Sequence, residues 1–302
     1  MTQADSIAIH GNKFTFEIAP VLLAAESFYP GEATVKLGGI ANLFELEGIP
    51  GFAEPGVADV ATHAETQGLR YSVGSPDLRI ILTVARGLYR LAARRSAGIE
   101  SVADLKGKRI ATISNTSSGY FLHRLLQSAG LGSDDVEIVR ILPLSDMGKA
   151  LAAGEVDAVT IWEPYMEDAV AALGDDVIEF SGKGIYHEMF NLNTSAANLS
   201  DPEKRAKIVT FVRAIIDASA AIRHDPSLAW PLIHKSGGHP MDVIERAWPH
   251  HDYPALLDPQ LLDVMALEEK WLAAMDGRTA RSREQLSQLI DPSVLEEALA
   301  KS

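Results

Sequence analysis

The chain has 302 residues, of which 47% are hydrophobic, enough apolar material for two ordinary domains. Its 27 basic and 41 acidic residues give a formal net charge of −14. An acidic surface of this size repels phosphate backbones, so we expect no nucleic-acid partner. The chain contains no cysteine, which excludes disulfides, thiolate metal sites and a cysteine nucleophile.

The first residues, Met1 to Ser6, carry neither a basic nor an apolar segment, so the sequence predicts no secretory leader. Two locations therefore stay open: periplasmic if a leader was removed, or cytoplasmic. No uncharged apolar run in the sequence reaches the length of a membrane span.

Short β-branched segments alternate with amphipathic helical segments up to about residue 190. A representative helix is Tyr120–Ala129, whose leucines fall on one face. Such alternation is typical of α/β layers with largely parallel sheets. The predicted strands are Ser6–His10, Ala33–Leu37, Val57–Thr62, Leu78–Val84, Arg109–Ile113, Val136–Ile141 and Ala158–Ile161.

Beyond about residue 200 the pattern predicts helices only. Asp201 fits the N-cap of the clearest one, with Pro202 in its first turn, and the helical spacing continues to about His224. Two further helices are predicted at Pro259–Met275 and Pro292–Ala300.

The domains lack a low-complexity linker, so we expect ordered crossovers rather than a flexible tether. We place two crossovers near Leu88–Arg94 and His187–Asn193. Residues 1–92 with residues 190–302 then form lobe I, and residues 93–189 form lobe II.

Several signatures of catalysis are missing from the sequence. It holds no phosphate-binding P-loop, no dinucleotide-binding glycine motif and no nucleophile elbow. His187 and Glu188 begin a zinc-protease motif, but Asn191 stands where its second histidine would be. His250 and His251 are adjacent, a poor arrangement for chelating one metal. We therefore expect no catalytic residue, no metal site and no cofactor.

A polar cluster of Asn115, Thr116, Ser117 and Ser118 lies between a predicted strand and a predicted helix. Its hydroxyls and the first free backbone N–H groups of the helix suit an anion, and the helix dipole adds to this. The structural alternative is that Ser117 or Ser118 only caps the helix. The cluster supplies more polar groups than one cap needs, which favours binding.

A second strand-to-helix corner follows Thr62 and contains His63, Glu65 and Thr66. Sheets of this class bind ligands beyond the carboxyl ends of their strands. We expect this corner to face the first across a cleft and to contact the same anion. His63 either donates to the anion or is a satisfied residue at a strand end.

Three further side chains are candidates for ligand contact. Trp162 either stacks on the ligand or packs in the core. Asn191 and Asn193 either offer their amides to the ligand or hold the hinge. Glu163 fits a carboxylate at a helix start better than a ligand contact.

Four segments resemble those of a known protein family. They are Ser101–Ile110, Asn115–Gly119, Gly154–Ala158 and Ile161–Tyr165. In this order and spacing they are similar to the nitrate, taurine and alkanesulfonate type of ABC-transporter solute-binding proteins, which are periplasmic binding protein-like (type 2). The resemblance implies an α/β, two-lobed fold with two crossover hinge segments and a helical C-terminal part.

The same resemblance implies a receptor that captures a small organic anion, such as a sulfonate, a carboxylate or an aromatic acid. It would deliver this ligand to the membrane permease of an ABC transporter, and we expect it to be a monomer. The N-terminal fifty residues match the family poorly, and Gly48–Gly56 replaces its usual helix.

Two alternatives remain open, because a fold does not determine function. Some relatives of this family are cytoplasmic enzymes: a desulfinase of aromatic sulfinates, a pyrimidine-precursor synthase and certain decarboxylases. The first two rely on cysteines, which this chain lacks. The other alternative is a sensor that closes on a ligand without transporting it.

Overall fold

The computed structural model describes residues 6–48 and 51–300. Residues 1–5, on which the leader prediction partly depends, and residues 49–50 of the Gly48–Gly56 segment lie outside the described residues. The chain forms two compact units. Unit 1 comprises Met1–Arg86, Met189–Gly238 and Asp252–Ser302, and unit 2 comprises Gly87–Glu188 and His239–His251.

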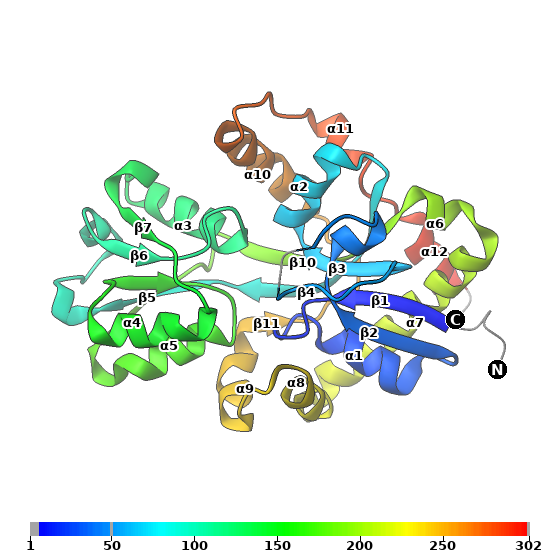
Figure 1. The fold of residues 1–302 in the computed structure, drawn as a ribbon, viewed down its shortest axis with the longest axis horizontal. Coiled ribbons are helices and arrows are strands. Elements are labelled where there is room, and N and C mark those ends of the chain that lie inside the picture. The colour runs from blue at the N-terminus through cyan, green and yellow to red at the C-terminus, as the bar shows by residue number, and fades with distance from the viewer. Residues whose placement is uncertain (1–5, 49–50, 301–302) are drawn as a thin grey trace. The chain divides into compact units, whose positions relative to one another are not determined.

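Unit 1 is built on a six-stranded sheet with the strand order β11-β4-β10-β3-β1-β2 (Figure 1). Strand β1 pairs in parallel with β2 and β3, whereas β10 runs antiparallel to β3. The isoleucines of β1 alternate at period two and are buried. The strands are β1 Ser6–Gly11, β2 Glu32–Leu37, β3 Val60–Ala64, β4 Leu78–Leu88, β10 His187–Ser195 and β11 His251–Asp252.

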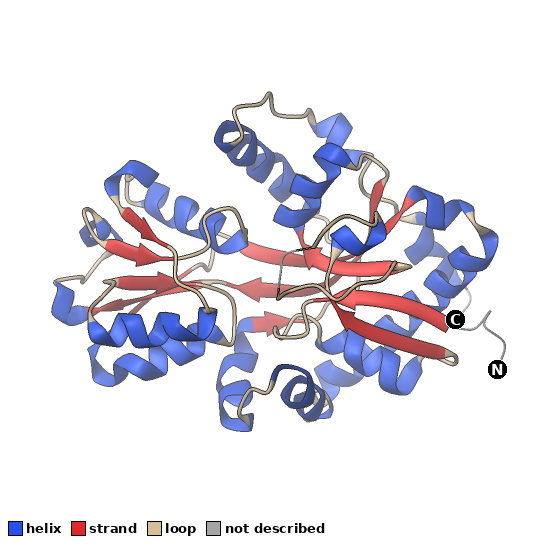
Figure 2. Cartoon of the chain, in the orientation of Figure 1, coloured by secondary structure: helices blue, strands red, loops and turns tan. Residues whose placement is uncertain are grey.

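Helices lie on both faces of this sheet (Figure 2). The longest, α7, begins as predicted: the Asp201 carboxylate accepts the backbone N–H groups of Glu203 and Lys204. The helices of unit 1 are α1 Ala19–Leu23, α2 Glu65–Gly74, α6 Ala196–Ser200, α7 Pro202–His224, α8 Trp230–Gly237, α10 Leu261–Met275, α11 Arg283–Ser287 and α12 Ser293–Ala300.

Unit 2 is built on a five-stranded sheet with the strand order β7-β6-β8-β5-β9. Strand β6 is parallel to both β7 and β8, and β5 is antiparallel to β8 and β9. The strands are β5 Arg90–Arg94, β6 Arg109–Ala111, β7 Glu137–Val139, β8 Ala158–Thr160 and β9 Val177–Ser181. The helices are α3 Ser117–Ser128, α4 Met147–Ala153, α5 Tyr165–Leu173 and α9 Met241–Ala247.

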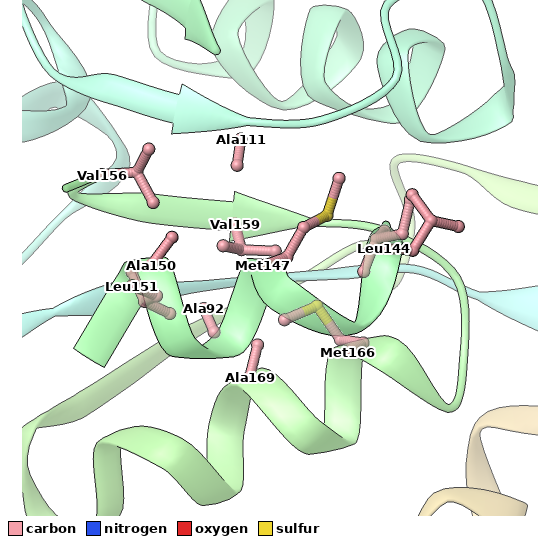
Figure 3. Packing of buried hydrophobic residues seen from close by; sticks show 11 residues of the cluster. Ala92, Ala111, Leu144, Met147, Ala150, Leu151, Val156, Val159, Met166 and Ala169 are labelled. Atoms are coloured by element: carbon pink, nitrogen blue, oxygen red, sulfur yellow. The ribbon is translucent and has the colours of Figure 1, made fainter. Parts of the chain in front are cut away.

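One face of the unit 2 sheet is covered by α4 and α5 (Figure 3). Met147 of α4, Met166 of α5 and Val159 of β8 belong to one buried cluster that also contains several alanines. Burying each such side chain contributes about 1.5–3 kcal/mol, which anchors the carboxyl ends of β6 and β8.

Several elements differ from the sequence-based expectation. Strand β3 begins three residues later and ends two residues later than predicted, so His63 lies inside it. Strands β5, β9 and β10 are not among the predicted strands, and β11 interrupts a region predicted to be helical only. The reason is that these strands are defined by pairing with distant segments, as when Leu91 of β5 lies opposite Phe180.

The compact units differ from the predicted lobes at residues 87–92, which belong to unit 2, at Met189, which belongs to unit 1, and in one longer segment. Residues 239–251, which the sequence assigns to lobe I, belong to unit 2. The chain therefore passes between the units after Arg86, Glu188, Gly238 and His251. The first two passages lie at or near the predicted crossovers.

Candidate functional site

The polar corner of unit 2 lies between the end of β6 and the start of α3. Thr116 is the N-cap residue of α3, and its side chain makes no capping hydrogen bond. Ser117 and Ser118 are the first two residues of the helix, so neither one is the N-cap. An uncapped helix leaves its first backbone N–H groups available to a ligand.

The hydroxyl of Ser117 is buried and fully used. It donates to Oε1 of Glu188 at 2.7 Å, and the hydroxyl of Tyr89 lies 2.8 Å from it. A serine hydroxyl has one proton, so Tyr89 must be the donor in the second bond. Ser117 has no proton left for an anion.

The hydroxyl of Ser118 is used in the same way. The Thr116 hydroxyl donates its one proton to the Ile113 carbonyl at 2.8 Å. In its 3.0 Å contact with Ser118 it must therefore accept, and the Ser118 hydroxyl donates. Ser118 also accepts from Thr112 at 3.1 Å. The hydroxyls therefore fix the shape of the corner, and the donors left for an anion are the backbone N–H groups of Ser117, Ser118 and Gly119.

Gly119 is required at this corner by packing. A Cβ atom at this position would lie 2.1 Å from the carbonyl oxygen of Ser114, in the turn that precedes the helix. Asn115, in the same turn, is exposed. The close approach of turn and helix sets the direction in which the first N–H groups point.

Trp162 lies at the same edge of the unit 2 sheet. Strand β8, which leads into it, is the parallel neighbour of β6, with Val159 opposite Ala111. The indole is partly buried against the core of α4 and α5. Its Nε1 is buried and has no hydrogen-bond partner among the described residues. Trp162 thus packs as the structural alternative predicted and also keeps one unused donor.

Glu163 belongs to a buried ionic network centred on Arg90. Arg90 donates to Glu163 at 2.9 and 3.1 Å, to Glu167 at 2.7 Å and to Glu179 at 2.6 Å. Burial raises the pKa of Glu163, and the charge of Arg90 opposes that rise. Glu163 also accepts the backbone N–H of Glu167 at 2.9 Å, the helix-start role expected from the sequence.

The same network holds α9, which sequence reasoning placed elsewhere. Arg246 of α9 donates to Glu167 at 2.9 Å and to Asp242 at 2.9 Å. The rings of His239 and Tyr165 meet edge to face at 6.1 Å. These contacts explain why residues 239–251 pack with unit 2.

The polar corner of unit 1 lies between β3 and α2. The Glu65 side chain is fully buried and accepts the backbone N–H of Met189 at 2.8 Å. Thr66 is also fully buried, and its hydroxyl has no hydrogen-bond partner among the described residues. No side chain caps α2, so the first N–H groups of this helix are also available.

His63 at this corner is held between a glycine and a tyrosine. A Cβ atom at Gly39 would lie 2.7 Å from Cε1 of His63, and the His63 ring stacks on Tyr71 at 6.1 Å. Burial, with a smaller effect from Arg70, lowers the pKa of His63 to about 4. His63 is therefore neutral near pH 7 and can offer a ligand a hydrogen bond but no positive charge.

Asn191 uses its side chain inside unit 1. Its Oδ1 accepts from the Thr83 hydroxyl at 2.9 Å, and its Nδ2 donates to the Met189 carbonyl at 2.9 Å. Both partners belong to unit 1, so the Asn191 amide is used within that unit. Sequence reasoning missed His10, a buried polar residue of β1, because an isolated polar residue in an apolar strand gives no signal by itself.

Among residues 6–48 and 51–300, no helix combines the length and apolarity needed to cross a membrane. The same residues contain no group of three or more histidines or carboxylates arranged to hold a metal ion.

A family model described as "NMT1/THI5 like" matches residues 16–229. The chain belongs to this family. Two relatives share the name "Putative aliphatic sulfonates-binding protein". The one from Escherichia coli is 29% identical over 57% of this chain and 52% of its own length. The one from Bacillus subtilis is 30% identical over 66% of this chain and 62% of its own length. The chain thus spans about half to three fifths of these curated relatives.

Solved structures establish the fold of this NMT1/THI5-like chain. The periplasmic aliphatic sulphonate binding protein SsuA of E. coli matches with a TM-score of 0.70 at 19% identity, covering 93% of this chain and 91% of its own. The periplasmic nitrate-binding protein NrtA of Synechocystis matches with a TM-score of 0.72 at 12% identity, covering 99% of this chain and 89% of its own. The desulfurization enzyme DSZB matches with a TM-score of 0.64 at 16% identity, covering 98% of this chain and 99% of its own. The predicted family resemblance and the two-lobed α/β fold are both confirmed.

Proposed function

We propose that this protein is the solute-binding receptor of an ABC-type uptake system and captures a small organic anion. Its family membership and the names of its relatives support this function. The observation that carries the proposal is the uncapped start of α3, where hydrogen-bonded hydroxyls fix three backbone N–H groups that have no side-chain acceptor.

We assign the anionic group of the ligand to this corner, beside Trp162. His63 and the start of α2 are proposed to contact the same ligand from unit 1. A receptor of this kind works in the periplasm with a membrane permease and as a monomer. The sulfonate names of the relatives make a sulfonate the first ligand to test, followed by carboxylates and aromatic acids.

Ligand capture is tested by native mass spectrometry of the purified protein, followed by calorimetry with alkanesulfonates and benzoate. A receptor returns the bound ligand chemically intact and shows a smaller radius of gyration by X-ray scattering when ligand is bound. Turnover of a sulfinate or a carboxylate would instead support the enzyme alternative, which the comparisons do not favour.

Gly119→Ala tests the α3 corner directly. The new methyl group would collide with the Ser114 carbonyl, so the turn must shift and misalign the N–H groups. We expect at least tenfold weaker binding, about 1.4 kcal/mol. Gly74→Ala is the matched control, because Gly74 also lies in a helix and nothing lies within 4 Å of its added Cβ. Equal affinity of both folded variants would contradict the assignment.

A further inference from the structure

Three polar side chains share one face of the unit 1 sheet. His10 of β1 lies opposite Ala61 of β3, and Ala61 lies opposite Asn193 of β10. Residues paired across neighbouring strands point to the same face, and His63, two residues beyond Ala61, points there as well. Between His10 and Asn193 this face carries Ala61, which packs in an apolar cluster with Ile40, Leu43, Ala58 and Leu78.

All three side chains keep hydrogen-bonding atoms that no described residue uses. His10 is 1% exposed, and both of its ring nitrogens are buried without a partner. Nδ1 of His63 and Oδ1 of Asn193 are also buried without a partner among the described residues, and Asn193 is 1% exposed. Leaving such a group unsatisfied costs about 1–3 kcal/mol, so each one indicates a bound ligand or a water molecule.

The orientation of the Asn193 amide is fixed by its own contacts. Its Nδ2 donates to the carbonyls of Ala61 at 3.2 Å and Asn191 at 2.9 Å. The oxygen therefore occupies the other position and needs a donor.

Burial favours the neutral form of both imidazoles. Burial, with a further contribution from Lys36 that Glu54 partly opposes, lowers the pKa of His10, and the pKa of His63 falls to about 4. A neutral imidazole offers one N–H donor and one acceptor lone pair. Together with the Asn193 oxygen, these atoms match a partner that both donates and accepts hydrogen bonds.

Glycine backbone holds the rings in place. A Cβ atom at Gly38 would lie 2.9 Å from Cδ2 of His10, and one at Gly39 would lie 2.7 Å from Cε1 of His63. The Asn42 side chain connects the backbone at Gly39 with that at Gly56. It accepts from the Gly39 N–H at 3.1 Å and donates to the Gly56 carbonyl at 3.0 Å. Side chains held this rigidly lose little freedom when they bind a partner.

We propose that this face of unit 1 binds an uncharged hydrogen-bonding group of the ligand, such as a hydroxyl or an amide. This rests on the proposed function, which supplies an anionic ligand. The face thereby selects polar organic anions against those with a plain hydrocarbon tail. His63 is the partly exposed member of the three.

Matched ligand pairs test this selection by isothermal titration calorimetry. The pairs are propanesulfonate with its terminally hydroxylated analogue, and benzoate with meta-hydroxybenzoate. We expect the hydroxylated member of at least one pair to bind about tenfold more tightly, since one buried hydrogen bond replaces an unsatisfied group.

Variants then locate the selecting groups. His63→Phe keeps a flat ring but removes both nitrogens, so the preference for the hydroxylated ligand should fall to near one. His63→Gln keeps a donor and an acceptor and should restore part of the preference. His224→Phe, at the exposed end of α7, is the control and should change nothing. Circular dichroism verifies that each variant is folded.

The outcomes separate this inference from the proposed function. Equal binding of both members in both pairs would mean that the face holds only water, and the inference fails while the receptor function stands. A preference that survives in His63→Phe would also overturn it. Failure of the protein to bind any sulfonate or carboxylate would overturn the proposed function, and this inference with it.

Discussion

The α3 corner of unit 2 and the α2 corner of unit 1 share a backbone design but differ in how their side chains are satisfied. Each is the uncapped start of a helix that follows a strand with a parallel neighbour. At α3 every hydroxyl proton is used within unit 2. At α2 the His63 ring and the Thr66 hydroxyl keep buried atoms without partners among the described residues. A satisfied network fixes geometry, whereas unsatisfied groups await a ligand or water.

The largest expected effect concerns the network beneath the unit 2 corner. Arg90→Leu leaves Glu163, Glu167 and Glu179 facing one another without their shared cation. We expect a loss of about 3–5 kcal/mol in the free energy of unfolding, the usual cost of breaking a buried ion pair. Urea denaturation measures it. Arg140→Leu, at an exposed position of unit 2, should be nearly neutral. A similar loss in both variants would show that the buried ion pairs of Arg90 stabilise the fold no more than an exposed arginine does.

The dependence of the free energy of unfolding on pH tests whether the unit 1 corner keeps His63 neutral. The pKa of His63 is lowered from 6.5 to about 4, so above pH 6.5 the residue is neutral whether folded or unfolded. As the pH falls from 6.5 toward 4, the unfolded chain gains a proton that the folded chain resists, and stability is lost. The loss from this residue reaches about 3 kcal/mol at most.

His63→Phe removes this contribution and should flatten the stability profile over the same pH range. Thermal unfolding of both proteins at a series of pH values checks it. His250, whose pKa is also lowered to about 4 by burial and then by Arg90, keeps part of the acid dependence in the variant. Identical profiles with and without His63 would mean that it is not held neutral by the fold.

Ser117→Ala tests whether the α3 hydroxyls are structural. The variant leaves Glu188 and Tyr89 without their shared hydroxyl, so we expect the free energy of unfolding to fall by about 1–3 kcal/mol. Ser114→Ala, in the exposed turn before the helix, is the control. If stability were unchanged and anion affinity fell instead, Ser117 would be a direct ligand contact and the contrast between the corners would be wrong.

The smallest expected effect concerns α9. Arg246→Gln removes the contact with Glu167 at the surface of unit 2, and the Arg246 side chain is 48% exposed. Exposed ion pairs contribute little to global stability, so we expect a local change only. Hydrogen exchange in Met241–Ala247 should become faster, with the rest of unit 2 unchanged. Asp242→Asn, which leaves the Glu167 contact in place, should show a smaller increase.

The sequence by itself predicted the family, the fold class and the elements whose signals are local. The helix after Asp201 and the strand-to-helix corner at Asn115–Ser118 follow from capping residues and periodicity within about one turn of the chain. Those signals also located both candidate corners, although the strand before His63 was predicted too early.

Only the tertiary structure decided how the polar groups at those corners are used. Ser117 meets its acceptor Glu188 across 71 residues, and Asn191 meets Thr83 across 108. The neutrality of His63 depends on burial beneath Gly39 and beside Tyr71. Hydrogen-bond partners and burial are set by segments far apart in the sequence, and no local pattern encodes which of them will meet.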